Sequence, residues 1–134
     1  MRIEKKDVPK PLQKYLDHEF SSGPYTGADY NSFQASYGRW LKKLLQGYDV
    51  EIHKGHYELS ATVTRKGATE DKNRYVYISI SDVRFFSLRW VDDILVRQMR
   101  YAKDWTGCRN HYATMKNLKT MVDELMDKPL ESSV

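Results

Sequence analysis

The spacing of apolar residues changes once along the chain, near Gly47, and this change constrains the fold more than any other feature. Before Gly47, apolar residues recur every three or four positions, as on one face of an α-helix. They are Tyr30, Phe33, Tyr37, Trp40, Leu41, Leu44 and Leu45. After Gly47, apolar and polar residues alternate, which is typical of a strand with one buried face. We therefore predict a helix with Asp29 as its N-cap and Gly47 at its end, followed by a β-sheet.

Three alternating runs after this helix predict strands. They occupy residues 48–53, 57–64 and 74–81. Residues 94–101 suit either a strand or a helix, and we favour a fourth strand that follows a short turn at residues 88–92. A loop over residues 103–113 leads to a last helix, predicted to begin at Thr114 and to end near Pro129. The fold class is α+β, with a three- or four-stranded antiparallel sheet and with an N-terminal and a C-terminal helix packed on one face.

The length of 134 residues is enough for one domain with a modest core. We expect residues 1–24 to form a loosely ordered N-terminal arm, residues 25–128 a single α+β domain, and residues 129–134 a frayed tail. The one cysteine, Cys108, cannot form an internal disulfide, and no apolar run approaches the roughly 18–20 residues of a membrane span. The sequence therefore predicts a cytoplasmic protein. A monomer and a homodimer both stay open, because an unpaired edge strand or the uncovered sheet face can support a dimer.

The turn between the first two strands decides which polar residues meet. Residues 54–55 are predicted to form a two-residue hairpin turn, because the glycine there can take positive φ. In that register Glu51 lies opposite Glu58, and both share one face with His53 and His56. Two histidines and two glutamates can bind a divalent metal or perform acid–base chemistry. Exposed polar residues at a hairpin tip are more often simply solvated, so we assign no metal and no cofactor.

A second acidic group consists of Asp82, Asp92 and Asp93, which stand near Arg84 and Arg97 in the sequence. Paired carboxylates near a cation are found in metal-dependent nucleases. However, neighbouring residues such as Asp92 and Asp93 point to opposite faces of a strand, and Asp82 with Arg84 is more often an ion pair. A small nuclease using His, Asp or Glu residues is therefore kept as an alternative, without assigned catalytic residues.

Residues 84–119 carry the basic excess of the chain. They contain eight Lys or Arg residues against three Asp, a local excess of +5, whereas the whole chain has a net charge of +4. Aromatic residues are interleaved with these cations, a pattern that suits a polyanion because charge attracts phosphate and rings stack on bases. The predicted binding residues are Arg84, Arg97, Arg100, Lys103, Trp105, Asn110, His111 and Tyr112.

Several spaced motifs between residues 55 and 125 carry a family resemblance. They are Gly55-His56-Tyr57, residues 75–86, Trp90, residues 93–97, residues 103–107, Asn110, Tyr112 and Thr114. The chain resembles small uncharacterised proteins of Gram-positive phages and conjugative elements, a group that includes anti-CRISPR inhibitors. The resemblance implies a counter-defence role in the host bacterial cytoplasm, with a CRISPR effector nuclease or its guide RNA as the partner. It implies no catalytic residue, and Cys108 stands where that pattern has a second glycine.

The leading hypothesis is therefore an anti-CRISPR-like inhibitor that binds an effector nuclease, or its guide RNA complex, through a basic and aromatic surface. A sequence pI near 9.1 argues against an acidic mimic of DNA and favours contact with guide RNA or an acidic protein face. The first alternative is a nucleic-acid-binding accessory protein of a phage or conjugative element. The second alternative is the small nuclease, for which no recognised motif spacing is present.

Overall fold

The computed structural model of the protein describes residues 5–16, 28–54, 58–67, 74–80, 88–104 and 107–131. Within these residues, the helices and strands follow one another in the order η1 (Lys5–Asp7), η2 (Lys10–Tyr15), α1 (Ala28–Leu44), β1 (Tyr48–Lys54), β2 (Leu59–Arg65), β3 (Tyr75–Ile80), α2 (Arg89–Asp92), β4 (Ile94–Met99), β5 (Asn110–Ala113) and α3 (Leu118–Asp127). The elements η1 and η2 are 3-10 helices.

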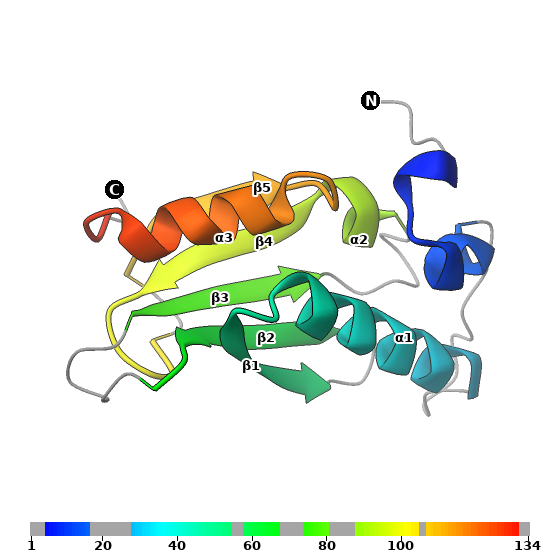
Figure 1. The fold of residues 1–134 in the computed structure, drawn as a ribbon, viewed down its shortest axis with the longest axis horizontal. Coiled ribbons are helices and arrows are strands. Elements are labelled where there is room, and N and C mark those ends of the chain that lie inside the picture. The colour runs from blue at the N-terminus through cyan, green and yellow to red at the C-terminus, as the bar shows by residue number, and fades with distance from the viewer. Residues whose placement is uncertain are drawn as a thin grey trace.

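The strands form one antiparallel sheet in which neighbours along the chain are also neighbours in the sheet (Figure 1). The predicted α+β class with an antiparallel sheet is confirmed, but the described residues contain five strands rather than three or four. The additional strand, β5, lies in the segment predicted to be a loop. Its four residues carry one buried apolar side chain, Ala113, so no alternating pattern marks it in the sequence. Pairing with the longer β4 forms a strand that the local sequence does not signal.

Helices α1 and α3 lie on the same face of the sheet (Figure 1). Strand residues that point to this face are buried, namely Leu59, Ala61, Val63, Val76, Ile78, Ile80, Ile94 and Val96. The predicted stripe of α1 is confirmed as the surface that covers them, because five of its residues are buried: Tyr30, Phe33, Tyr37, Leu41 and Leu45. Each large side chain buried in this way stabilises the fold by about 1.5–3 kcal/mol.

The short turn predicted before the fourth strand is confirmed as α2, and it inserts Trp90 into the core. This indole is 0% exposed, and its ring centroid lies 5.3 Å from that of Phe33 and 6.2 Å from that of Tyr37. The Tyr37 hydroxyl donates a hydrogen bond to the Trp90 carbonyl at 3.1 Å, and burial raises the pKa of this phenol. Helix α1 is thereby joined to the connection between β3 and β4.

The described part of the N-terminal segment belongs to the core. Val8, Leu12 and Tyr15 are all less than 5% exposed. The Tyr15 ring packs edge-on against Phe33 at 5.2 Å, and its hydroxyl donates to Ser32 at 2.9 Å. The segment expected to be a loosely ordered arm therefore covers one end of α1 with apolar side chains over residues 5–16.

The observed register of β1 and β2 differs from the predicted one. Lys54 pairs with Leu59, and Glu51 lies opposite Thr62 rather than opposite Glu58, so the predicted two-residue turn is wrong. Both registers keep the apolar residues on the same face, because they differ by an even number of residues. The observed register avoids a pair of opposed glutamates, which would destabilise the sheet.

The last helix begins later than predicted and is held at its C-terminal end by arginines. Thr114 and Asn117 form a turn, in which the Thr114 backbone N–H donates to the Asn117 side chain at 2.7 Å, and α3 starts after Asn117. Arg65 donates to the Met126 carbonyl at 2.6 Å, and Arg74 donates to carbonyls of the same helix end. These cations satisfy carbonyls that a helix leaves unpaired and oppose the negative end of its dipole.

Gln98 is the buried polar residue that fixes the segment after α3. Its side-chain amide nitrogen donates to the carbonyls of Leu125 and Lys128, each at 3.0 Å, and to that of Pro129 at 3.2 Å. Its amide oxygen accepts from the Glu131 backbone N–H at 2.9 Å. Because Gln98 is only 1% exposed, these bonds satisfy groups that water cannot reach from the core side.

Replacement of Gln98 by leucine tests this arrangement. Arg74 also donates to the carbonyls of Leu125 and Lys128. The Pro129 carbonyl and the Glu131 backbone N–H, however, would lose the hydrogen bonds that Gln98 provides. We expect Gln98→Leu to lower the free energy of unfolding by about 2–3 kcal/mol in urea titrations. The matched control is Gln46→Leu, at an exposed position, with an expected change below about 0.5 kcal/mol. Equal effects of the two variants would contradict this account.

Candidate functional site

The sheet face away from α1 and α3 is called the open face here. Its side chains, read from the strand register, are Asp49, Glu51, His53, Ser60, Thr62, Thr64, Tyr75, Tyr77, Ser79, Leu95, Arg97, Met99, Asn110 and Tyr112. No described helix covers this face, in agreement with the prediction that both long helices pack on one face of the sheet. The register aligns one row across all five strands, formed by Glu51, Thr62, Tyr77, Arg97 and Asn110.

Arg97 is the β4 residue of this row and lies between Tyr77 of β3 and Asn110 of β5. Its guanidinium carbon lies 5.4 Å from the centroid of the Tyr77 ring, which is a cation–π contact. The Arg97 Nε is buried and has no hydrogen-bond partner among the described residues. In the next row Tyr112 lies opposite Leu95, and its ring is 58% exposed. This part of the open face therefore presents a guanidinium and two rings.

The structure brings together only some of the eight predicted binding residues. Three of them share the open face: Arg97, Asn110 and Tyr112. Lys103 stands beside the same face, on the connection between β4 and β5. Arg84 and Trp105 lie outside the described residues. The two remaining residues, Arg100 and His111, are engaged in contacts within the protein.

His111 points to the opposite side of the sheet from Asn110 and Tyr112. It lies opposite Val96 in the register, and its Nε2 is 2.7 Å from a carboxylate oxygen of Glu131. The hydrogen bond from His111 holds the pKa of Glu131 below its ordinary value, and the charge of Lys128 acts in the same direction. His111 therefore fastens the segment after α3 to β5.

Arg100 shapes the connection between β4 and β5. Its guanidinium donates to both carboxylate oxygens of Asp104, at 2.9 and 3.1 Å, and its backbone N–H donates to the same carboxylate at 3.0 Å. Asp104 is 2% exposed, so this charge is buried and paired. Burial, reinforced by Asp104, raises the pKa of Cys108, which disfavours a reactive thiolate there.

Four of the seven cations described in the basic segment form ion pairs with carboxylates. Besides Arg100 with Asp104, the ion pairs are Arg89 with Asp93 at 3.3 Å, Lys116 with Asp7 at 2.9 Å and Lys119 with Asp123 at 2.7 Å. Among the described residues of the segment, Arg97, Lys103 and Arg109 form no ion pair. The predicted basic surface is thus reduced, in the part of the chain described, to these three cations.

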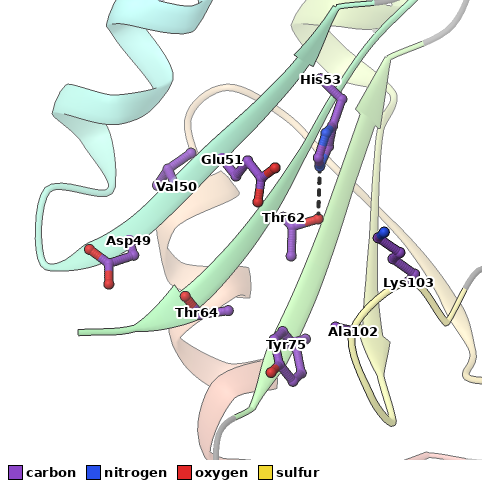
Figure 2. Close-up of a pocket in the computed structure, with 9 residues that line it drawn as sticks. All are labelled: Asp49, Val50, Glu51, His53, Thr62, Thr64, Tyr75, Ala102 and Lys103. Carbon is purple, nitrogen blue, oxygen red and sulfur yellow. Dashed lines mark hydrogen bonds between the residues drawn. The ribbon is translucent and has the colours of Figure 1, made fainter. Parts of the chain in front are cut away.

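A cavity of about 590 Å³ lies on the open face over β1, β2 and β3. Its lining residues are Asp49, Val50, Glu51, His53, Thr62, Thr64, Tyr75, Ala102 and Lys103 (Figure 2). The carboxylates come from β1 at one side, and Lys103 comes from the connection at the other side. Lys103 has φ of 63°, an uncommon value for a side-chain-bearing residue. Because Asp49 and Glu51 line one side and Lys103 lines the other, the cavity has an acidic side and a basic side.

The predicted hairpin cluster is only partly assembled. Glu51 and His53 share the open face, where the His53 Nε2 is 3.1 Å from the Thr62 hydroxyl (Figure 2). Glu58 is exposed and precedes β2, while His56 lies outside the described residues. Within the described ranges, no group of three or more His, Cys, Asp or Glu side chains is placed to hold a metal.

The second acidic group is also separated in part. Asp93 is ion-paired with Arg89, and Asp92 lies in α2. Asp82 and Arg84 lie outside the described residues. The arrangement that suggested a nuclease is therefore not assembled in the part of the chain that the structure describes.

Two features of the site were missed by the sequence prediction. Tyr77 is not among the predicted binding residues, although it lies under Arg97. The cavity side chains Asp49 and Thr62 were also not grouped. Their alternation in sequence gave the correct face, but the neighbours across strands depend on strand order and register, which the sequence alone did not fix.

Comparison with protein-family models, curated proteins and solved structures finds no match to this chain. None of the helices in the described ranges has the length and apolar character needed to cross a membrane.

Replacement of Gly107 by alanine tests how rigidly the connection between β4 and β5 is built, and the same replacement at Gly67 and Gly47 provides the comparison. Gly107 has φ of 118°, and an added Cβ would lie 2.4 Å from the Arg100 guanidinium. Gly67 has φ of 72° with no atom within 4 Å of an added Cβ, and Gly47 has neither restriction. We expect Gly107→Ala to cost about 2–3 kcal/mol of unfolding free energy, Gly67→Ala about 1 kcal/mol, and Gly47→Ala below about 0.5 kcal/mol. A Gly107→Ala protein as stable as Gly67→Ala would show that the Arg100 contact is readily displaced.

The Glu131 carboxylate predicts a dependence of stability on pH. Because its pKa is lowered in the folded protein, the ionised carboxylate, which accepts a hydrogen bond from His111, stabilises the fold above the ordinary glutamate pKa, and this contribution is lost as pH falls through the folded value. The unfolding free energy of the wild type, measured in urea titrations, should fall between about pH 6 and pH 3. We expect the fall for Glu131→Gln to be smaller by on the order of 0.5 kcal/mol. The control Glu124→Gln removes an exposed carboxylate of α3, and it should follow the wild-type pH profile.

Proposed function

We propose that the protein is a binding protein of the counter-defence type, and that it inhibits a CRISPR effector complex by contacting guide RNA with its open face. The observation that carries the proposal is the Arg97 guanidinium held over Tyr77 on that face. Asn110, beside Arg97 in the same row, adds hydrogen-bonding groups, and Tyr112 adds an exposed ring. The mobile-element setting comes from the sequence resemblance alone.

The chemistry of this surface supports a single-stranded nucleic acid rather than a duplex. Unpaired bases can stack on aromatic rings and on guanidinium planes, whereas the bases of a duplex are already stacked on one another. Tyr77 and Tyr112 lie on strands β3 and β5, on either side of Arg97 in β4. An open sheet that presents rings and a cation in this order suits the splayed bases of an RNA strand.

The charge of the site supports a limited contact with phosphates. Only Arg97, Lys103 and Arg109 lack an ion pair among the described residues of the basic segment. If each of these cations neutralises one phosphate of a single strand, the logarithm of affinity should fall with the logarithm of salt concentration with a slope of about −2. Such a shallow slope agrees with recognition that depends on stacking as much as on charge.

The variant Arg97→Gln tests the proposal. It removes the guanidinium over Tyr77 and leaves a shorter, uncharged polar side chain. We expect about tenfold weaker binding to an effector–guide RNA complex, measured by fluorescence anisotropy, and a matching loss of nuclease inhibition, since one stacked contact contributes about 1–3 kcal/mol. The matched control is Lys43→Gln, which removes an exposed cation from α1 on the other side of the sheet.

The outcomes separate the proposed inhibitor from the alternative. Equal binding by Arg97→Gln and wild type would overturn the assignment of the open face. Tight binding of free single-stranded RNA without inhibition of the effector would instead favour a nucleic-acid-binding accessory protein. Absence of binding to RNA, free or within the effector complex, at low salt would overturn the proposed function, because low salt strengthens phosphate contacts.

A further inference from the structure

Strand β1 forms one edge of the sheet. It pairs with β2 on one side, and no described segment pairs with its other side. The strand spans Tyr48–Lys54 and contains neither proline nor glycine, so its outward backbone groups form a continuous edge. The other edge strand, β5, has four residues and lies beside the segment fastened by His111 and Glu131. Of the two edges, β1 is the longer.

The position of β1 is fixed within the fold. The Tyr48 hydroxyl donates to the Asp123 carboxylate of α3 at 2.6 Å, and Lys119 donates to the other oxygen of the same carboxylate at 2.7 Å. Burial and the bond to Asp123 raise the pKa of Tyr48 to about 12, so the phenol stays a donor throughout the neutral range. An edge held in this way needs little ordering to accept another strand.

Two hollows flank this edge, and the side chains that line them next to β1 differ in charge. On the open face, the cavity of about 590 Å³ is lined along β1 by Asp49, Glu51 and His53. On the helix side, a second hollow of about 240 Å³ lies between α1 and β1, and its lining includes three cations: Arg39, Lys42 and Lys54. The strand thus separates the acidic side of the open-face cavity, which Lys103 lines on its other side, from a basic hollow.

We propose that β1 accepts an extended segment of a partner protein as a sixth strand, and that this segment alternates basic and acidic residues. Successive side chains of an added strand point to opposite faces of the sheet. Basic side chains would therefore meet Asp49 and Glu51, while acidic side chains would meet Lys42 and Lys54. Backbone hydrogen bonds supply the affinity and the two hollows supply the specificity, as in other cases of strand addition.

A second copy of this chain fits the edge less well. When two copies pair antiparallel through β1 into one continuous sheet, the open faces of both copies lie on the same side. Asp49 and Glu51 of each copy then share that side, and their like charges oppose association. The charge pattern therefore favours a different partner over a homodimer.

The β1 edge lies apart from Arg97, the residue that carries the proposed RNA contact, although Lys103 lines the far side of the cavity next to β1. Strands β2 and β3 lie between β1 and Arg97 of β4. The inference does not rest on the proposed function, because peptide binding at the edge requires no nucleic acid. The variant Arg97→Gln should accordingly leave peptide binding unchanged, so failure of one proposal can be distinguished from failure of the other.

The test uses the full chain and two synthetic peptides of about seven residues, the length of β1. One peptide alternates lysine and glutamate, and the other has the same composition with the lysines and the glutamates in separate blocks. We expect the alternating peptide to bind about tenfold more tightly, and to shift the amide NMR signals of residues 49–54 and protect them from hydrogen exchange. Glu51→Lys and Lys54→Glu should each weaken binding several-fold, while Glu124→Lys on α3 should not.

Several results would overturn the inference. Equal affinity for the two peptides would reduce the effect to nonspecific charge attraction. Binding of neither peptide, or shifts confined to other elements, would exclude strand addition at β1. A dimer detected by sedimentation in the absence of peptide, with β1 amides protected, would show that a second copy occupies the edge. Circular dichroism checks that the Glu51, Lys54 and Glu124 variants, whose substituted side chains are exposed, and the Arg97 variant keep the wild-type fold.

Discussion

The covering of one sheet face by both long helices is the constraint on which the other properties of the protein depend. Because strand residues alternate in direction, burying one set under α1 and α3 commits the other set to the open face. Trp90 helps to hold α1 on the covered face, because it packs against Phe33 and Tyr37 of α1 from the connection between β3 and β4. The open face is thus a consequence of the core, and its residues are positioned by the same pairing that builds the sheet.

Strand β4 links the two faces most directly. Gln98 points to the helix side and bonds with the end of α3, whereas Arg97 points to the open face and lies over Tyr77. The two side chains are adjacent in the chain, so a shift of β4 by one residue would exchange them and leave both without their contacts. The stability of the C-terminal segment and the placement of the guanidinium therefore depend on one register.

The sequence was sufficient for the features that depend on local periodicity. The α1 stripe, the inward residues Val76, Ile78 and Ile80, and the turn around Trp90 follow from spacing alone. Strand β5, the register of β1 with β2, and the ion pairs of Arg100 and Lys116 depend on contacts between distant or loop segments. The basic segment illustrates the difference. Its net charge can be counted from the sequence, whereas the number of its cations that lack a carboxylate partner depends on the fold.

The open face is electrically uneven, and this limits which partners it can hold. Asp49 and Glu51 lie at the β1 side, whereas Arg97 lies on β4, with two strands between them. An RNA strand laid across the whole face would bring its phosphates against the two carboxylates, so attraction is confined to the β3–β5 side. A partner that presents RNA to that side and a protein segment to the β1 edge would match both halves of the sheet. The partner proposed above, an effector with its guide RNA, has this composition, whereas free nucleic acid offers nothing to the β1 edge.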